Sequence, residues 1–270
     1  MFFVFAPLVA LASFFLACSD GGGSGDPADL PDDPPAAAAE AAPDSAPAVA
    51  PYPTYVPEAP GIAVAVLIDR STSMREPPPG SETPKNVLAR DAVARVLEAT
   101  AGHLRENPET PVKVGVYYFS TKVLTALPMA PYDSAAVRAA LERTVAPSGF
   151  TAIGEAMEAA RLELYHSGAT RKYILVVTDG VNTTGVSPAE VAREIRDRSE
   201  GGVGMYFVAF DVDPAKFAFV EEAGGEVLPA AGGDQLREAL SKVYRTKILA
   251  EAEDYGDGFA QPRDTARAAP

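Results

Sequence analysis

The stretch IAVAVLI, residues 62–68, is apolar at every position and ends at Asp69. An unbroken apolar run of this length is typical of a strand covered on both faces, as the inner strands of a parallel sheet are. Outward from it, between Gly61 and about Ala250, short apolar runs alternate with segments of helical period. This alternation predicts an α/β fold with a central, mostly parallel sheet and helices on both faces.

The apolar runs predict the individual strands, and the helix-period segments predict the helices between them. Strands are expected at 62–68, 112–119, 173–178, 205–210 and 226–228, with a short antiparallel strand at 123–127 beside 112–119. Helices are expected from Thr83 and Pro84, from 133 or 134, and over 152–166, 187–198, 217–223 and 234–252. Within 112–119, Tyr117, Tyr118 and Phe119 are interpreted as core residues, with one Tyr facing outward.

Composition excludes several kinds of function. The chain has 23 Lys and Arg against 37 Asp and Glu, a formal charge of −14, which argues against a nucleic-acid partner because phosphate binding needs clustered basic residues. One Cys excludes a disulfide framework within the chain and a Cys-rich zinc site, and two His leave little for zinc or triad chemistry.

The amino end is predicted to be an export signal. Residues 1–17 form an apolar run that closes with Phe15-Leu16-Ala17 before Cys18. This box resembles a bacterial lipoprotein signal, which implies cleavage before Cys18, lipidation of that Cys, and a membrane-anchored location in the bacterial cell envelope. An ordinary cleaved signal and an uncleaved membrane anchor are the alternatives.

Two segments flank the predicted domain of residues 61–250. Residues 18–60 are rich in Gly, Ala, Pro and acidic residues, with few aliphatic ones. Such a segment buries too little apolar surface to offset its ordering entropy, so we expect a disordered acidic tether. Residues 251–270 are expected to be a loose tail.

Three clusters of oxygen-bearing side chains lie where a strand gives way to a loop or a loop leads into a helix. They contain Asp69, Ser71 and Ser73; Thr151; and Asp179. Hydroxyls and carboxylates without His or Cys suit a hard divalent cation, although hydroxyls just before helices also serve as caps. The two aspartates, with no Lys nearby, are expected to repel each other without a cation, and Arg70 is interpreted as part of the rim.

The three clusters form the motifs Asp-x-Ser-x-Ser at 69–73, a Thr following Gly-Phe at 149–151, and Thr-Asp-Gly at 178–180. Together they resemble the metal-ion-dependent adhesion site of a von Willebrand factor type A (vWA) domain. The resemblance spans Gly61 to about Ala250 and implies a three-layer, Rossmann-like fold with one antiparallel edge strand.

The resemblance also implies the role of each site residue. Ser71 and Ser73 would bind the cation directly, Thr151 directly or through water, and Asp69 and Asp179 largely through water. The cation would be Mg²⁺, with Mn²⁺ or Ca²⁺ as alternatives. An Asp or Glu carboxylate of a protein partner would fill the remaining coordination position.

We therefore expect an exported binding protein with an adhesion or surface-assembly role, not an enzyme, and without catalytic residues. One alternative is a metal-dependent hydrolase or phosphatase that uses Asp69 at the strand end. Another is a structural domain that binds no metal productively. The segment Asn182-Thr183-Thr184 is interpreted as a turn at the rim of the site, and Asp211 as part of a turn after its strand.

Overall fold

The computed structural model describes residues 56–143 and 145–250. Several predictions lie outside the described residues: the signal, the lipidation of Cys18, nearly all of the tether, and the tail. Within the described ranges, no helix combines the length and the apolar character that crossing a bilayer requires.

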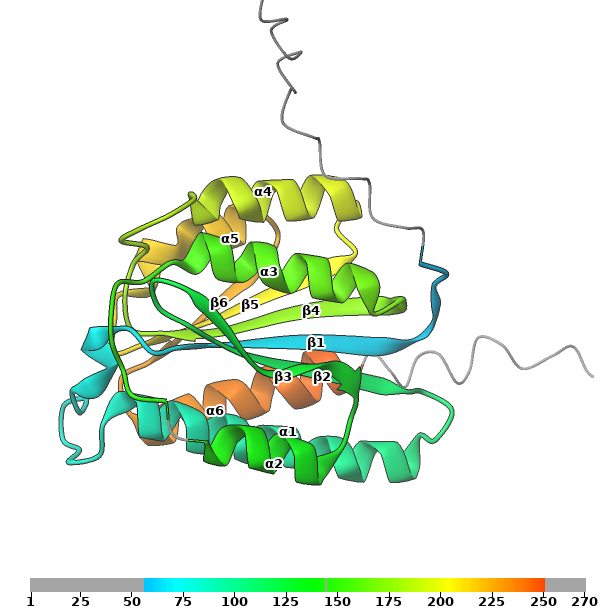
Figure 1. Cartoon of the computed structure of the whole chain (residues 1–270), viewed down its shortest axis with the longest axis horizontal. Helices are drawn as coiled ribbons and strands as arrows, with labels where there is room; N and C mark the ends of the chain where they lie inside the picture. The colour runs from blue at the N-terminus through cyan, green and yellow to red at the C-terminus, as the bar shows by residue number, and fades with distance from the viewer. Residues whose placement is uncertain (1–55, 144, 251–270) are drawn as a thin grey trace, which may run out of the picture. The chain divides into compact units, whose positions relative to one another are not determined.

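A six-stranded sheet forms the centre of the domain, in the order β3-β2-β1-β4-β5-β6 (Figure 1). All neighbouring strands are parallel except β2 and β3, so β3 is an antiparallel edge strand. This arrangement confirms the predicted fold class. The strands are β1 (Ala59–Asp69), β2 (Val112–Phe119), β3 (Val123–Pro131), β4 (Ala169–Thr178), β5 (Val203–Phe210) and β6 (Glu226–Ala230).

Helices cover both faces of this sheet and complete three layers (Figure 1). One face carries α1 (Lys85–Glu106), α2 (Ser134–Glu142) and α6 (Gly233–Val243), which continues as a π-helical segment over Tyr244–Leu249. The other face carries α3 (Ile153–His166), α4 (Pro188–Ser199) and α5 (Ala218–Glu222). Two short 3₁₀ helices, η1 (Thr72–Arg75) and η2 (Pro214–Phe217), follow β1 and β5.

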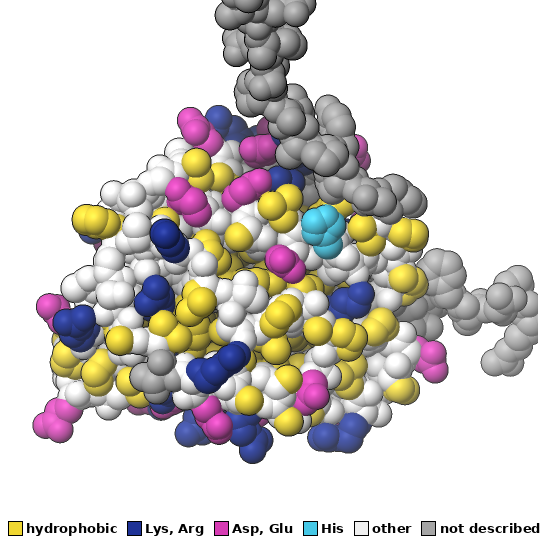
Figure 2. Space-filling view, viewed as in Figure 1, with side chains coloured by type: hydrophobic (Ala, Val, Ile, Leu, Met, Phe, Trp, Pro, Cys, Tyr) yellow, Lys and Arg dark blue, Asp and Glu magenta, His cyan; other side chains and the backbone are white. Residues whose placement is uncertain are grey.

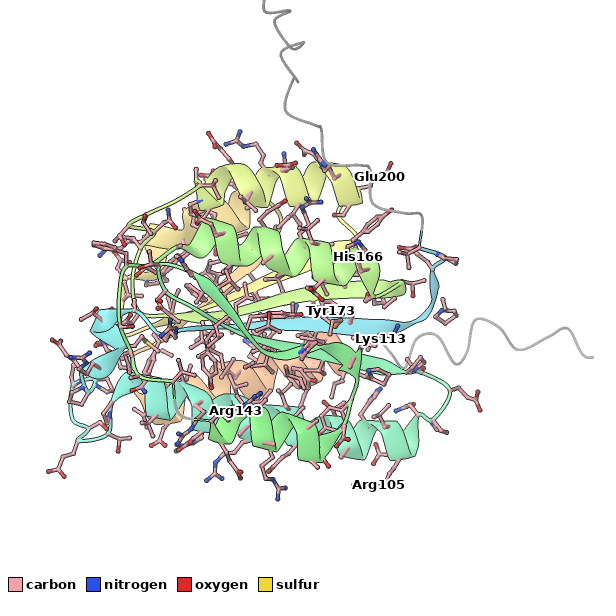
Figure 3. The ribbon with its side chains drawn as sticks, viewed as in Figure 1. Arg105, Lys113, Arg143, His166, Tyr173 and Glu200 are labelled. Atoms are coloured by element: carbon pink, nitrogen blue, oxygen red, sulfur yellow. The ribbon has the colours of Figure 1, made fainter. Side chains whose placement is uncertain are left out.

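Strand β1 contributes to both cores because its side chains alternate between the two faces. Ile62, Val64, Val66 and Ile68 belong to the core beneath α1 and α6, whereas Ala63, Ala65 and Leu67 belong to the core beneath α3. Side chains fill the space between the sheet and both helical layers (Figure 3). The position of β1 is therefore fixed from both sides, and so is the loop that follows it.

Two predictions, one about the tyrosines of β2 and one about the start of α1, are wrong. Tyr117 and Tyr118 are both buried, at 1% and 5% exposure, because each packs beneath the helices of its own face. The N-cap of α1 is Pro84 and not Thr83, and the backbone N–H of Lys85 donates instead to the Glu76 carbonyl at 3.0 Å.

On the face shown in Figure 2, basic and acidic side chains are interspersed and form no broad basic patch.

Candidate metal centre

The predicted site lies at the carboxyl edge of the sheet, at the point where the strand order reverses. From β1 the chain goes to β2 on one side, and β4 joins β1 on the other. Open α/β sheets bind ligands at such a switch point. Asp69 is the last residue of β1 and Asp179 follows β4 directly. Figure 3 labels His166 and Lys113, which lie at the opposite end of the molecule.

Hydrogen bonds join three of the predicted ligands into a row. The Ser71 and Ser73 hydroxyls are 3.1 Å apart, and the Ser73 hydroxyl donates to Asp179 Oδ1 at 2.7 Å. Ser71 precedes η1, yet its side chain makes no capping hydrogen bond. Capping of η1 therefore does not explain the Ser71 hydroxyl, which lies beside the Ser73 hydroxyl.

Asp69 is fully buried behind this row, and both of its carboxylate oxygens are engaged. Oδ1 accepts from the backbone N–H of Ser71 at 2.6 Å, and Oδ2 accepts from the Thr178 hydroxyl at 2.6 Å. Burial raises the pKa of Asp69 to about 6, although these hydrogen bonds oppose the shift. A carboxylate held in this way orients the Ser71 turn and is poorly placed for nucleophilic attack.

Thr151 reaches the site from the loop before α3. Its backbone N–H donates to the Thr183 hydroxyl at 2.9 Å, and its carbonyl accepts from the Thr183 N–H at 2.8 Å. Its side chain does not cap α3, whose N-cap is Ala152. A Cβ placed on Gly180 would lie 3.8 Å from Thr151 Oγ1, so this hydroxyl lies close to the residue after Asp179. The structure thus brings all five predicted ligands to one edge.

Asn182 has a role that the sequence analysis missed. Its side-chain oxygen accepts from the backbone N–H of Ile153 at 2.7 Å, at the start of α3. Asn182 thereby ties the loop after Asp179 to the helix that follows Thr151. Asn is a common capping residue, but the helix it serves lies earlier in the chain, so local sequence gave no signal for it.

Lys85 overturns the expectation that the two aspartates have no Lys nearby. Its Nζ lies 2.8 Å from Asp179 Oδ2 and 3.3 Å from Asp211 Oδ2, and its side chain is only 8% exposed. Burial by itself lowers the pKa of Lys85, but the two carboxylates together raise it above its ordinary value. The prediction failed because Lys85, in the first turn of α1, precedes Asp179 by 94 positions in the sequence, yet its side chain reaches the residues that follow β4 and β5.

Asp211 does more than shape its turn. It adopts a left-handed backbone conformation, with φ of 55°, and its N–H donates to the Ala230 carbonyl at 2.7 Å. Its carboxylate shares the Lys85 ammonium with Asp179.

The donor set fits a hard divalent cation. It offers two carboxylates and three hydroxyls, the oxygen ligands that such ions prefer. Within the described ranges, no three or more His, Cys, Asp or Glu side chains are placed so that they could hold a metal ion together. Lys85 offsets one negative charge at Asp179, so this carboxylate does not depend on a bound cation for charge compensation.

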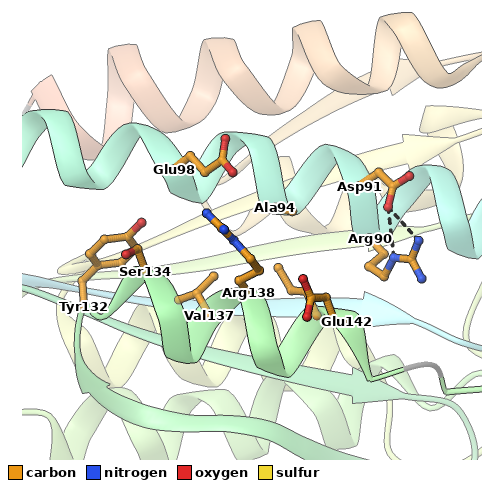
Figure 4. A pocket seen from close by; sticks show the side chains of 10 residues that line it. Arg90, Asp91, Ala94, Glu98, Tyr132, Ser134, Val137, Arg138 and Glu142 are labelled. Carbon is orange, nitrogen blue, oxygen red and sulfur yellow. Dashed lines mark hydrogen bonds and ion pairs between the residues drawn. The ribbon is translucent and has the colours of Figure 1, made fainter.

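A separate groove of about 340 Å³ lies between α1 and α2 (Figure 4). Side chains of both signs line it, among them Glu98, Arg138 and Glu142, and Arg90 pairs with Asp91 beside it. Its lining does not single out one ligand chemistry, and we assign it no role.

Residues 64–182 match the family model of the von Willebrand factor type A domain. The sheet order and the three layers agree with the fold of this domain. No curated protein matches the chain in sequence.

Several solved structures share this fold. BatB from Bacteroides thetaiotaomicron is 20% identical over 71% of this chain and all of its own, with a TM-score of 0.56. The PilB minor pilin of Streptococcus sanguinis is 16% identical over 70% of this chain and 62% of its own, with a TM-score of 0.58. Proximal thread matrix protein 1 from the mussel byssus, with a zinc-occupied MIDAS motif, is 22% identical over 73% and 47%, with a TM-score of 0.53. At these identities the similarity shows the fold alone.

Proposed function

We propose that this chain is an exported, membrane-tethered protein that binds a protein partner through a divalent cation. The observation that carries the proposal is the row of oxygens from Ser71 through Ser73 to Asp179, with Thr151 and Asp69 beside it. The hydroxyls of Ser71 and Thr151 serve no capping role that would otherwise explain them.

Each residue has a distinct role in this proposal. Ser71 and Ser73 bind the cation directly, Thr151 binds directly or through water, and Asp69 and Asp179 hold ordered water and orient the hydroxyls. Mg²⁺ is the proposed ion, with Mn²⁺ and Ca²⁺ as alternatives. The cation supplies local positive charge in a chain of net charge −14, which allows an Asp or Glu carboxylate of the partner to approach.

The similar structures support a role in adhesion or surface assembly in the bacterial envelope. They include the pilin named above, the pilus adhesin SpaC of Lactobacillus rhamnosus GG and an aerotolerance-related membrane protein of Bacteroides fragilis. The byssus protein supports the presence of a cation at this motif, since its MIDAS held zinc. Lipidation at Cys18 would supply the tether, and mass spectrometry of the mature amino end tests it.

A hydrolase that uses Asp69 as nucleophile is less well supported. Asp69 is fully buried and both of its oxygens accept hydrogen bonds, so a substrate would have no open approach to it. We therefore assign no catalytic residue.

Calorimetric titration of the purified whole chain with Mg²⁺, Mn²⁺ and Ca²⁺ tests the cation site. We expect saturable binding that Ser73→Ala weakens strongly, because this substitution removes a ligand and the hydrogen bond to Asp179. Ser241→Ala, on α6 and far from the site, is the matched control and should bind as the native chain does. Absence of saturable binding of all three ions to the native chain would refute the proposal.

A further inference from the structure

Three large apolar side chains are exposed on the loops that surround the candidate metal centre. Phe150 is 63% exposed, Val186 is 48% exposed and Val181 is 40% exposed. Phe150 immediately precedes Thr151, and Val181 follows Asp179 and Gly180. We call these three residues the apolar rim. Large apolar side chains grouped beside a binding site commonly mark an interaction surface.

The loop that carries Phe150 is held in place by hydrogen bonds. The Phe150 N–H donates to the Thr121 hydroxyl at 3.0 Å, and the Gly149 carbonyl accepts from the Thr72 N–H at 3.2 Å. Gly149 has φ of +83°, and a Cβ there would lie 2.5 Å from Thr121 Oγ1, so the loop fits closely against the β2–β3 turn. The exposed ring therefore stands on an ordered loop.

The loop that carries Val181 and Val186 is equally well anchored. The Val186 N–H donates to Glu155 Oε1 at 2.9 Å, and its carbonyl accepts from the Asn182 side chain at 3.2 Å. A surface that is already ordered loses little conformational entropy when a partner binds.

Basic side chains on the surrounding loops favour an acidic partner. Arg70, Arg75 and Lys122 stand on the loops after β1 and β2, together with one acidic residue, Glu76. Of the other carboxylates at this edge, Asp69 and Asp179 are buried, and Asp179 and Asp211 pair with Lys85. The Arg70 and Arg75 guanidiniums donate to the Ala146 and Pro147 carbonyls, and within the described ranges no carboxylate pairs with either of them or with Lys122.

We propose that the apolar rim binds an acidic segment of a separate protein. In this segment, a carboxylate completes the cation site, and a large apolar side chain next to the carboxylate packs against the rim. This inference rests on the function proposed above and specifies its partner. The apolar contacts would exclude water around the bridge between cation and carboxylate, and the basic loops would attract the acidic segment.

Phage display tests the proposal. Short random peptides displayed on phage are selected for binding to the purified whole chain in the presence of Mg²⁺. Peptides retained in Mg²⁺ and released by EDTA should be enriched in Asp or Glu next to Leu, Ile, Phe or Met. For a synthetic peptide of the selected sequence, Phe150→Gln should weaken binding about tenfold, the scale expected when burial of one large apolar side chain is lost. Binding of Mg²⁺ by this variant should be unchanged. Leu162→Gln, at an exposed position on α3, is the control and should bind the peptide as the native chain does.

The outcomes separate this inference from the function on which it rests. Enrichment of carboxylates without an apolar neighbour would overturn the role of the rim and leave the cation-bridged function intact. Absence of any Mg²⁺-dependent enrichment would overturn both. If the chain self-associates and Phe150→Gln abolishes the self-association, the rim binds a second copy of the chain. If the chain binds anionic lipid vesicles and Phe150→Gln abolishes this binding, the rim binds a membrane. Either result would overturn the inference.

Discussion

Replacement of Lys85 by Met tests the charge arrangement beneath the candidate metal centre. The substitution leaves Asp179 and Asp211 without the ammonium that they share at 2.8 and 3.3 Å. Removal of one partner from a buried ion pair costs about 3–5 kcal/mol. The Asp179 side chain is 0% exposed but that of Asp211 is 27% exposed, so water partly solvates one end. We therefore expect the free energy of unfolding to fall by about 3 kcal/mol, the lower end of that range.

A divalent cation should reduce this loss. A cation held beside Asp179 supplies positive charge where Lys85 did, so excess Mg²⁺ should stabilise Lys85→Met more than the native chain. At a hundredfold excess over its dissociation constant, a ligand stabilises the native state by about 2.7 kcal/mol. Urea unfolding in EDTA and in Mg²⁺ measures both effects. Far-UV circular dichroism is the appropriate probe, since the chain has no Trp.

Lys247→Met is the matched control. Lys247 Nζ lies 3.8 Å from Glu226 Oε2, and both side chains are well exposed, so loss of this pair should cost less than about 1 kcal/mol. Equal stability of Lys85→Met and the native chain in EDTA would refute the structural importance of the buried pair. An equal loss in EDTA and in Mg²⁺ would refute the placement of a cation beside Asp179.

Three further predictions concern pH, the core and the loops of the site. In EDTA, the raised pKa of Asp69 means that the folded state binds more protons than the unfolded state between about pH 4 and 6, so the free energy of unfolding should fall as pH rises through this window. Asp69→Asn should remove this pH dependence, as measured by urea titration at several pH values. An unchanged pH dependence in the variant would contradict the assignment to Asp69. Thr100→Val leaves the buried Tyr244 hydroxyl, 2.7 Å from Thr100 Oγ1, without its partner, and should lower the free energy of unfolding by about 1–3 kcal/mol. Adding Tyr244→Phe to this variant should recover part of the loss. Equal stability of the native chain and Thr100→Val would refute the importance of this hydrogen bond. Asn182→Ala removes the acceptor for the Ile153 N–H, so it should lower the free energy of unfolding by about 1 kcal/mol. It should also weaken Mg²⁺ binding in calorimetry. Unchanged Mg²⁺ affinity would show that this hydrogen bond does not position the candidate ligands.

Local patterns account for the parts of the structure that could be predicted. The apolar run at 62–68 and the alternation after it specify strands and helices, because burial on two faces or on one is visible in the spacing of apolar residues. The site residues were identifiable for the same reason, since Asp69 and Asp179 directly follow such runs. Parallel strands bring their carboxyl ends to one edge, and this edge is where the five predicted ligands lie.

Other features depend on packing between distant segments. Tyr118 is buried because helices cover its face of the sheet, and alternation within β2 alone does not show whether that face is covered. The exposure of Phe150 likewise follows from the way its loop is held against Thr121.

By itself, then, the sequence determined the α/β architecture and pointed to five candidate ligands, because the spacing of apolar residues and the ends of the strands are visible locally. Only the tertiary structure decided the charge and support of the site. Lys85 meets Asp179, and Asn182 caps α3, across long separations in sequence. Such contacts form because helices pack at fixed positions on the sheet, and no local pattern of residues encodes which side chains then face each other.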